Sequence, residues 1–124
     1  RPKTQVYHPN CIVVLEPTIM NAVNVFEGLS SGAILIVNSD ALPSEITVPL
    51  QVETVATVDA TRIAMETIGR PIPNTVMLGA FVRATGWVNL ATINARIGEL
   101  FGPQNVLAAK RGYEETEIYL RRDL

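Results

Sequence analysis

The side chains of this chain that could do acid–base chemistry are few, and they are not spaced as a catalytic pair would be. Four acidic residues are candidates: Glu16, Asp40, Asp59 and Glu66. Nothing in the sequence sets two of them together as a general acid and a general base, so we expect structural duties on solvated surfaces or at helix caps. The chain also lacks the motifs GxSxG, HExxH, CxxC, the P-loop and GxGxxG.

The chain has one histidine and one cysteine, which is too few for a metal centre. His8 stands between Tyr7 and Pro9 and is expected to be a loop residue without metal partners. Cys11 opens an apolar run, where a free thiol packs as a small hydrophobic side chain. A lone cysteine excludes an intrachain disulfide and an iron–sulfur cluster held by this chain alone. We therefore expect the chain to hold no metal and no redox cofactor by itself.

Composition limits the function classes further. A chain of 124 residues with 48% hydrophobic and 18% charged residues can bury one core, so we expect a single domain over 1–124. The net charge of -2 leaves no basic face for nucleic acid. The longest apolar runs have five residues, which is too short to span a membrane, and no signal peptide is recognisable. These features predict a cytoplasmic protein without nucleic-acid or membrane partners.

Strand and helix patterns alternate along the first half of the chain. Apolar, β-branched runs predict buried strands at 11–16, 33–38 and 53–60, of the kind found in parallel sheets. Between the first two strands, a stripe from Thr18 as N-cap to Leu29 predicts a helix, giving a right-handed βαβ unit. The segment 39–51 has two prolines and no sustained period, and is expected to be a loop.

Helical periodicity dominates the second half of the chain. A helix over 60–68 is expected to stop at Gly69, and two later helices follow apolar stripes. The stripes consist of Leu90, Ile93, Ile97 and Leu100, and of Val106, Ala109, Tyr113 and Leu120. The last eleven residues, "EETEIYLRRDL", are charged and are expected to be a solvated tail.

The segment "GRPIPNTVMLGAFVRATG" at 69–86 combines a proline-rich break with an almost uncharged helix. The prolines enforce extended backbone, so Asn74 is expected to cap a helix over 75–85. Only Arg83 is charged in that helix, and we expect it to be buried centrally or in an interface.

The residues around this segment resemble a known family. "VDATRIAMETIGRPIPNTVMLGAFVRATG", preceded by "VFEGLSSGAILIVNS" and followed by "KRGYEET", is similar to the gamma subunit, or gamma domain, of the pyruvate/2-oxoacid:ferredoxin oxidoreductases, and the similarity spans nearly the whole chain. It implies an α/β fold, a Rossmann-like small parallel sheet flanked by helices. Family members begin with a Gly-rich strand-turn-helix that is absent from this chain, so we expect an N-terminal part to be missing and with it some of the ligand surface.

The resemblance implies a function in a larger assembly. Such enzymes decarboxylate a 2-oxoacid on thiamine pyrophosphate with Mg²⁺, pass electrons through iron–sulfur clusters to ferredoxin, and release an acyl-coenzyme A. Thiamine and clusters belong to partner subunits, and the gamma chain is expected to be non-catalytic. By motif position, the coenzyme A contacts would be Asn74 with Thr75, and Lys110 with Arg111. A helix N-terminus suits a phosphate or a carbonyl, and the basic pair suits phosphate charges.

Two other functions stay open at this point. The chain could be a purely structural subunit of the same complex, with the helix over 75–85 serving only to pack against partners. It could also be a freestanding nucleotide-binding domain, although the absence of a Gly-rich turn argues against that function. The identity of the 2-oxoacid is not encoded in any residue of this chain that we recognise.

Overall fold

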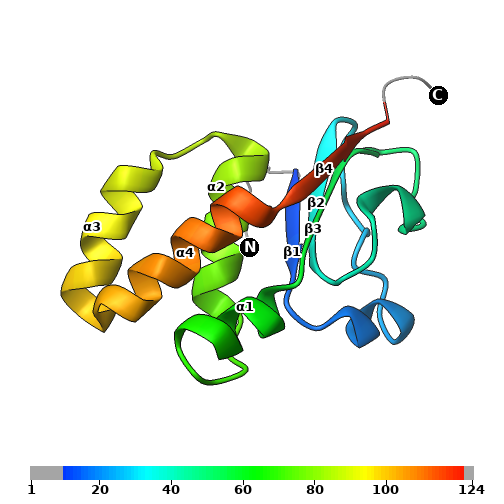
Figure 1. The fold of residues 1–124 in the computed structure, drawn as a ribbon. Coiled ribbons are helices and arrows are strands. Elements are labelled where there is room, and N and C mark those ends of the chain that lie inside the picture. Colours follow the sequence, from blue (N-terminus) through cyan, green and yellow to red (C-terminus); the bar gives the residue numbers. More distant parts are fainter. Residues whose placement is uncertain (1–9, 122–124) are drawn as a thin grey trace, which may run out of the picture.

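A four-stranded sheet in the order β1-β2-β3-β4 forms the centre of the computed structural model, which describes residues 10–121 (Figure 1). The first three strands are parallel: β1 (Cys11–Val14), β2 (Ala33–Asn38) and β3 (Val52–Val58). The fourth, β4 (Glu117–Leu120), runs antiparallel to β3. The predicted α/β fold with a small parallel sheet is therefore confirmed.

The two faces of the sheet are covered differently. Four α-helices follow β3 in the chain: α1 (Ala60–Thr67), α2 (Asn74–Thr85), α3 (Leu90–Phe101) and α4 (Pro103–Glu115). Helix α2 packs on β2 and β3 and is itself covered by α1 and α4. The other face carries two short 3₁₀ helices, η1 (Pro17–Asn21) and η2 (Pro43–Glu45), with the loops around them (Figure 1).

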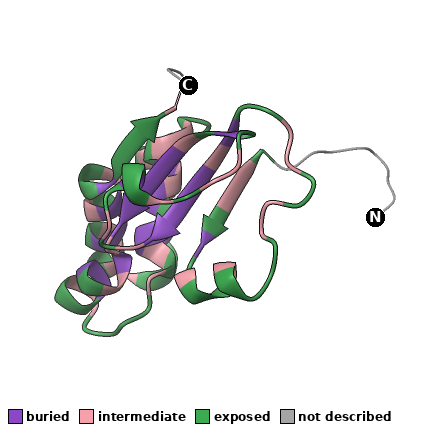
Figure 2. Cartoon of the chain, turned by 90° about the vertical axis from the view of Figure 1, so that its right-hand side faces the viewer, coloured by how far each residue is buried: buried purple, intermediate pink, exposed green. Residues whose placement is uncertain are grey.

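Burial is concentrated in the two central strands. Figure 2 shows β2 and β3 largely buried, whereas β1 and β4 at the edges are mostly half-buried or exposed. One core cluster joins Ile36, Ala56 and Val58 to the helices, and a second joins Leu35 and Val55 to the loop face. This alternation follows from the period-2 geometry of a strand, which sends successive side chains to opposite faces.

The predicted helix from Thr18 to Leu29 is wrong. Only Pro17–Asn21 form a short 3₁₀ helix, and turns follow it. The carboxylate of Glu16, not Thr18, takes the N-cap role by accepting from the Thr18 N–H. Of the apolar residues in this segment, Phe26 and Leu29 pack on the loop-face cluster and are brought there by turns, whereas Ile19 and Val23 are exposed.

The C-terminal tail contains a strand that the sequence did not predict. Helix α4 ends at Glu115, so Leu120 is not part of its stripe, and Glu117–Leu120 pair with β3. All four strand residues are exposed, so no alternation of apolar and polar side chains betrays the strand. The strand β4 is held by backbone hydrogen bonds to β3, and such pairing leaves no periodic pattern in the sequence.

The helix predicted over 75–85 is central, as expected, and two glycines allow its closest contact. A Cβ on Gly79 would overlap the Ala109 carbonyl of α4, and a Cβ on Gly112 would overlap the Val76 carbonyl of α2. The two helices therefore cross at a distance where their backbones touch.

Helix α1 is followed by Gly69 with φ of +84°, the left-handed stop that the sequence predicted. Within residues 10–121, no helix is both long and apolar enough to cross a membrane.

Candidate functional site

The N-terminus of α2 carries the two predicted ligand contacts, Asn74 and Thr75. The expected cap is wrong, because Pro73 is already helical (φ -81°, ψ -2°) and occupies the N-cap position without a side-chain bond. Asn74 is the first helical residue, and its side chain is exposed. Among residues 10–121, the Asn74 amide has no hydrogen-bonding partner.

Thr75 has a structural partner. Its hydroxyl donates to the Asn105 Oδ1 at 2.9 Å, and the Asn105 amide nitrogen donates in turn to the Phe101 carbonyl at 3.2 Å. The bond ties the start of α2 to the first turns of α4. The two adjacent residues therefore have different roles. The Thr75 side chain fixes the start of the helix, whereas the Asn74 side chain makes no hydrogen bond within residues 10–121 and is available to a ligand.

An apolar groove lies between the end of β1 and α2, and Asn74 is one of its lining residues. Its volume is about 410 Å³, and it is lined by Val13, Leu15, Asn74, Met77, Leu78 and Phe81. Val13 and Leu15 are 40% and 41% exposed, although residues of this type at the end of a parallel strand are normally buried. Asn74 is the one amide side chain among these lining residues, so the groove offers one polar contact beside an apolar wall.

The basic pair Lys110 and Arg111 lies on α4, and its two members differ. Lys110 is exposed. Arg111 binds the Glu66 carboxylate at 2.8 Å through Nη1 and the Glu115 carboxylate at 2.7 Å through Nε. The Arg111 guanidinium holds the pKa of both carboxyl groups below the usual value, while hydrogen bonding to Glu115, and then to Glu66, raises the arginine's own pKa.

The structure gives these four residues no common hydrogen bond or ion pair within residues 10–121. Arg111 is committed to acidic partners on α1 and α4, and Thr75 to Asn105. Asn74 and Lys110 are the two with side chains that are exposed. Their roles as ligand contacts stay predictions.

The acidic candidates named from the sequence mostly have structural duties. Glu16 caps η1, Asp59 caps α1 by accepting from the Arg62 N–H, and Glu66 belongs to the ion pairs with Arg62 and Arg111. Asp40 is exposed and lines a hollow described below. His8 lies outside the described residues.

Cys11 packs against the helix-face core, as predicted. Burial raises the pKa of its thiol to about 11, because the thiolate is poorly solvated there. The thiol is therefore protonated at neutral pH, and among residues 10–121 no three His, Cys, Asp or Glu side chains are grouped to hold a metal ion.

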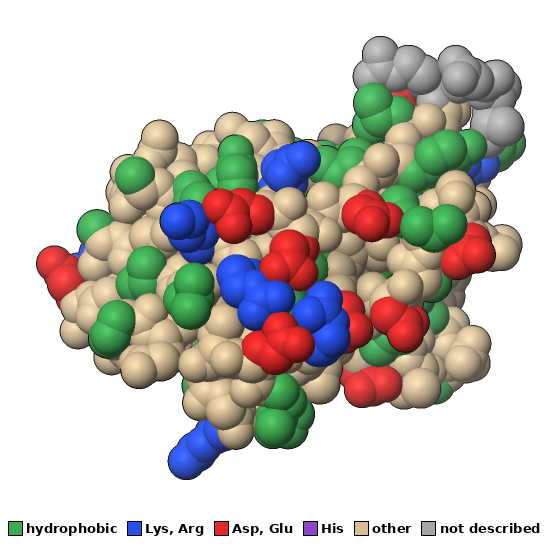
Figure 3. All heavy atoms as spheres, viewed as in Figure 1, with side chains coloured by type: hydrophobic (Ala, Val, Ile, Leu, Met, Phe, Trp, Pro, Cys, Tyr) green, Lys and Arg blue, Asp and Glu red, His purple; other side chains and the backbone are tan. Residues whose placement is uncertain are grey.

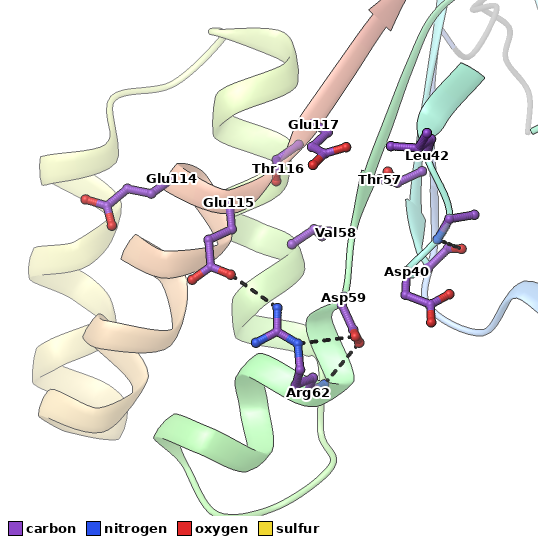
Figure 4. A pocket seen from close by; sticks show the side chains of 12 residues that line it. Asp40, Leu42, Thr57, Val58, Asp59, Arg62, Glu114, Glu115, Thr116 and Glu117 are labelled. Carbon is purple, nitrogen blue, oxygen red and sulfur yellow. Dashed lines mark hydrogen bonds and ion pairs between the residues drawn. The ribbon is translucent and has the colours of Figure 1, made fainter. Parts of the chain in front are cut away.

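A second hollow, of about 610 Å³, lies at the carboxyl ends of β2 and β3 (Figure 4). Its wall comes from the loop after β2, the end of β3, the start of α1 and the α4–β4 junction. The lining residues are Ser39, Asp40, Ala41, Leu42, Thr57, Val58, Asp59, Arg62, Glu114, Glu115, Thr116 and Glu117. Sequence reasoning missed this hollow, because β4, which closes it, was not predicted.

Comparison with known proteins places the chain in a family. The sequence pattern described as pyruvate ferredoxin/flavodoxin oxidoreductase matches residues 1–115. The common gamma subunit of the pyruvate/ketoisovalerate oxidoreductases of Pyrococcus furiosus is 42% identical over 125 residues, covering 96% of this chain and 68% of that protein. The gamma subunit of the NADH-dependent phenylglyoxylate dehydrogenase of Aromatoleum evansii is 37% identical, covering 96% of this chain and 65% of that protein.

A solved structure supports the same relationship. The crystal structure of the pyruvate oxidoreductase subunit PORC of Thermotoga maritima superimposes with a TM-score of 0.80 at 39% identity, covering 91% of this chain and 66% of that one. The chain thus spans about two thirds of the length of these relatives. From this similarity in sequence and fold, we conclude that the chain belongs to the pyruvate ferredoxin/flavodoxin oxidoreductase family, among its gamma subunits.

Proposed function

We propose that the chain is the gamma subunit of a thiamine-dependent 2-oxoacid oxidoreductase, in which it helps to assemble the complex and to bind coenzyme A. The overall reaction turns a 2-oxoacid and coenzyme A into carbon dioxide and an acyl-coenzyme A, and two electrons go to ferredoxin or to an NAD-linked acceptor. Partner subunits hold the thiamine pyrophosphate, Mg²⁺ and iron–sulfur clusters in this proposal. The chain alone is expected to be inactive, since its single cysteine and single histidine cannot hold a redox centre.

The names of the relatives support a role that does not depend on the oxoacid. The Pyrococcus relative is a common subunit of oxidoreductases for pyruvate and for ketoisovalerate, and the Aromatoleum relative serves an enzyme for phenylglyoxylate. A subunit shared between two oxoacids is a poor candidate for distinguishing them. Binding the acyl acceptor, which the reactions have in common, fits a shared subunit better.

The free amide of Asn74 is the observation that carries the proposed coenzyme A contact. It needs no partner for the helix, because it is not the cap, and it lines the apolar groove. The pantetheine arm of coenzyme A alternates amide groups with aliphatic carbons, so an amide beside an apolar wall is complementary to it. The free N–H groups in the first turn of α2 add donors at the same place.

The other three proposed contacts differ in how free their side chains are to meet coenzyme A. Lys110 is exposed and can meet a phosphate of the coenzyme. Arg111 can do so only by sharing a guanidinium that already binds Glu66 and Glu115. Thr75 contributes through its position at the helix start, since its hydroxyl is bonded to Asn105.

The test compares two asparagines in the reconstituted complex. Asn74→Ala should raise the Michaelis constant for coenzyme A about 2- to 10-fold, which corresponds to the loss of one hydrogen bond. The melting temperature and the Michaelis constant for the 2-oxoacid should stay unchanged. Asn89 is the matched control, because its side chain caps α3 by accepting from the Thr92 N–H. Asn89→Ala should lower the melting temperature and leave the constant for coenzyme A unchanged.

A second comparison separates the phosphate contact. Lys110→Met should weaken coenzyme A, and the loss should shrink with dephospho-coenzyme A if the 3′-phosphate is the partner of the lysine.

The alternative function is a structural subunit without ligand contacts. The packing duties of Gly79, Gly112 and Thr75 favour it, because these motif residues serve the α2–α4 contact. If Asn74→Ala and Lys110→Met both keep the wild-type constant for coenzyme A in an active complex, the structural function stands and coenzyme A binding is rejected.

A further inference from the structure

We propose that the hollow at the carboxyl ends of β2 and β3 receives a basic side chain, arginine or lysine, of a partner subunit. This inference rests on the proposed function in one respect, namely that the chain assembles with other subunits. It does not depend on coenzyme A binding, because the hollow shares no lining residue with the groove at Asn74.

The hollow carries an excess of negative charge. Five carboxylates and one guanidinium line it. Arg62 binds Asp59 at 3.3 Å, Glu66 at 3.2 Å and Glu115 at 3.3 Å, so its charge is already shared among three acids. Among residues 10–121, Asp40, Glu114 and Glu117 have no ion pair.

Two of these unpaired acids lie on different walls of the hollow. Figure 4 shows Glu117 pointing from β4 towards Thr57 and Leu42, whereas the Asp40 carboxylate on the far side is turned away from Glu117, and Glu114 points out of the hollow. The carboxyl end of α4, at Glu115, adds the negative end of a helix dipole, and no basic residue stands in its last turn. An incoming cation would therefore gain from two carboxylates and from the helix end.

A buried hydroxyl supplies a further acceptor. Thr57 is 3% exposed and lines the hollow, opposite Glu117 in the β3–β4 ladder. Within the described residues its hydroxyl has no hydrogen-bonding partner, although the residue as a whole is buried, so the hydroxyl is available to a group that enters the hollow. Carboxylates with a hydroxyl form a set of acceptors that suits a guanidinium or an ammonium group, both of which carry several donors and no acceptor.

The surroundings favour a side chain of a protein over a free ion or a small anion. No three acids in residues 10–121 are grouped to hold a metal ion, and the acidic walls repel 2-oxoacids and the phosphates of coenzyme A. Next to the hollow, β4 exposes Ile118, Tyr119 and Leu120 at 38%, 40% and 43%. Figure 3 shows acidic and apolar side chains side by side over this part of the surface. Exposed apolar side chains next to a charged pocket are typical of a protein interface in which an arginine or lysine anchors the edge.

The unpaired edge of β4 supports the same occupant. Its outer backbone groups have no partner strand in residues 10–121, and a polypeptide laid along it can bond to them while its basic residue enters the hollow.

The experiment measures the affinity of the full-length chain for its co-expressed oxidoreductase subunits at 50 mM and 500 mM salt. The double variant Asp40→Asn with Glu117→Gln should bind about 10-fold more weakly at low salt, and the difference should shrink at high salt. Glu117→Arg should weaken binding more, because it places a like charge at the opening. Circular dichroism melting should show all variants folded, since both acids are exposed.

A control pair makes the same charge change elsewhere. Glu27→Gln with Glu99→Gln removes two exposed carboxylates outside the hollow and should bind as wild type does. If the Asp40 and Glu117 variants bind with wild-type affinity and salt dependence, the inference is overturned while the proposed function stands. If the wild-type chain itself does not bind the subunits, the proposed function fails instead.

Discussion

Asn74 stands out at the scale of single residues because several of its neighbours in the same motif are committed to packing, whereas its own side chain, like that of Lys110, is exposed. Thr75 is bonded to Asn105, and Gly79 is pressed against the Ala109 carbonyl. Gly112, in the second half of the motif, meets the Val76 carbonyl in the same way. A motif thus mixes residues that make the helix contact with a residue that the fold does not use, and only the second kind is a ligand candidate.

The Cys11 thiol gives a prediction at the same scale. Burial raises its pKa from 9.0 to about 11, so at pH 9 about 1% of the folded chain carries a thiolate, against about 50% of the unfolded chain. Alkylation by iodoacetamide at pH 9 should therefore be about 50-fold slower in buffer than in 6 M guanidinium chloride. Equal rates would show that the thiol is solvated and that its packing against the core is transient.

The sequence predicted residue identities better than residue partners. Thr75 and Arg111 were predicted as ligand contacts, which stays a prediction, and the partners that they have in the structure include Asn105 and Glu66, which lie far along the chain. No local spacing encodes such contacts. The cap at Asn74 failed for a local reason, since Pro73, fixed in φ, enters the helical region one residue earlier than the cap rule assumes.

At the scale of elements, the crossing of α2 and α4 positions the start of α2 and hence Asn74. Gly79→Ala would gain helix propensity of about 1 kcal/mol but would force a Cβ into the Ala109 carbonyl. We expect a net loss of about 1–3 kcal/mol in the free energy of unfolding, measured by urea denaturation. Gly98→Ala is the control, because its Cβ meets only the Val106 side chain, at 3.3 Å, and should be neutral or stabilising. Equal effects of the two changes would refute the close crossing.

The ion pairs between α1 and α4 predict a pH dependence. Hydrogen bonding to Arg111 lowers the pKa of Glu66 and of Glu115 below 4.5 in the folded chain. A carboxyl group whose pKa is lower in the folded chain than in the unfolded chain stabilises the fold. This stabilisation is fully present above pH 4.5, the unfolded pKa, and is lost as the pH falls through the pKa of the folded chain. Arg111→Met should therefore lower the melting temperature at pH 7 and make little difference at pH 3.

The matched control for these ion pairs is Arg96→Met, because Arg96 and Glu99 form a pair with both side chains well exposed. It should change the melting temperature little at either pH. A loss for Arg111→Met that is the same at pH 3 as at pH 7 would show that packing of the arginine, not its charge, carries the effect.

Element predictions succeeded where the hydrophobic pattern coincided with backbone hydrogen bonding and failed where it did not. The strands at 33–38 and 52–58 and the helices α1 to α4 have both signals. In the 18–29 segment only Met20, Phe26 and Leu29 reach the core, and they do so through turns, so an apparent helical stripe occurs without a helix. The strand β4 shows the opposite case, with backbone pairing but no buried face. The hollow beside β4 was unpredictable for that reason.

At the scale of the whole molecule, the two faces of the sheet differ in how they are built. The helix face has regular backbone bonding and a core cluster that includes Ile63, Val76 and Met77. The loop face rests on the short helices η1 and η2, joined by a few turn hydrogen bonds such as those from Ala22 to Ile19 and from Ile46 to Pro43. We therefore expect the helix layer, which holds the start of α2, to be more rigid than the loop layer.

This asymmetry predicts the pattern of amide hydrogen exchange. Amides in β2, β3 and α2 should exchange slowly, because they are buried and bonded within regular elements, and should report on global unfolding. Amides in 17–30 and 40–50 should exchange many-fold faster, because most of these residues are exposed or half-buried and few are bonded. Exchange followed by mass spectrometry resolves these segments, and destabilising α2 with Gly79→Ala should speed the slow class and leave the fast class unchanged. Equal protection of the loop segments and β2 would mean that the loop face is as rigid as the helix face, and the rigidity of the α2 start would then need another origin.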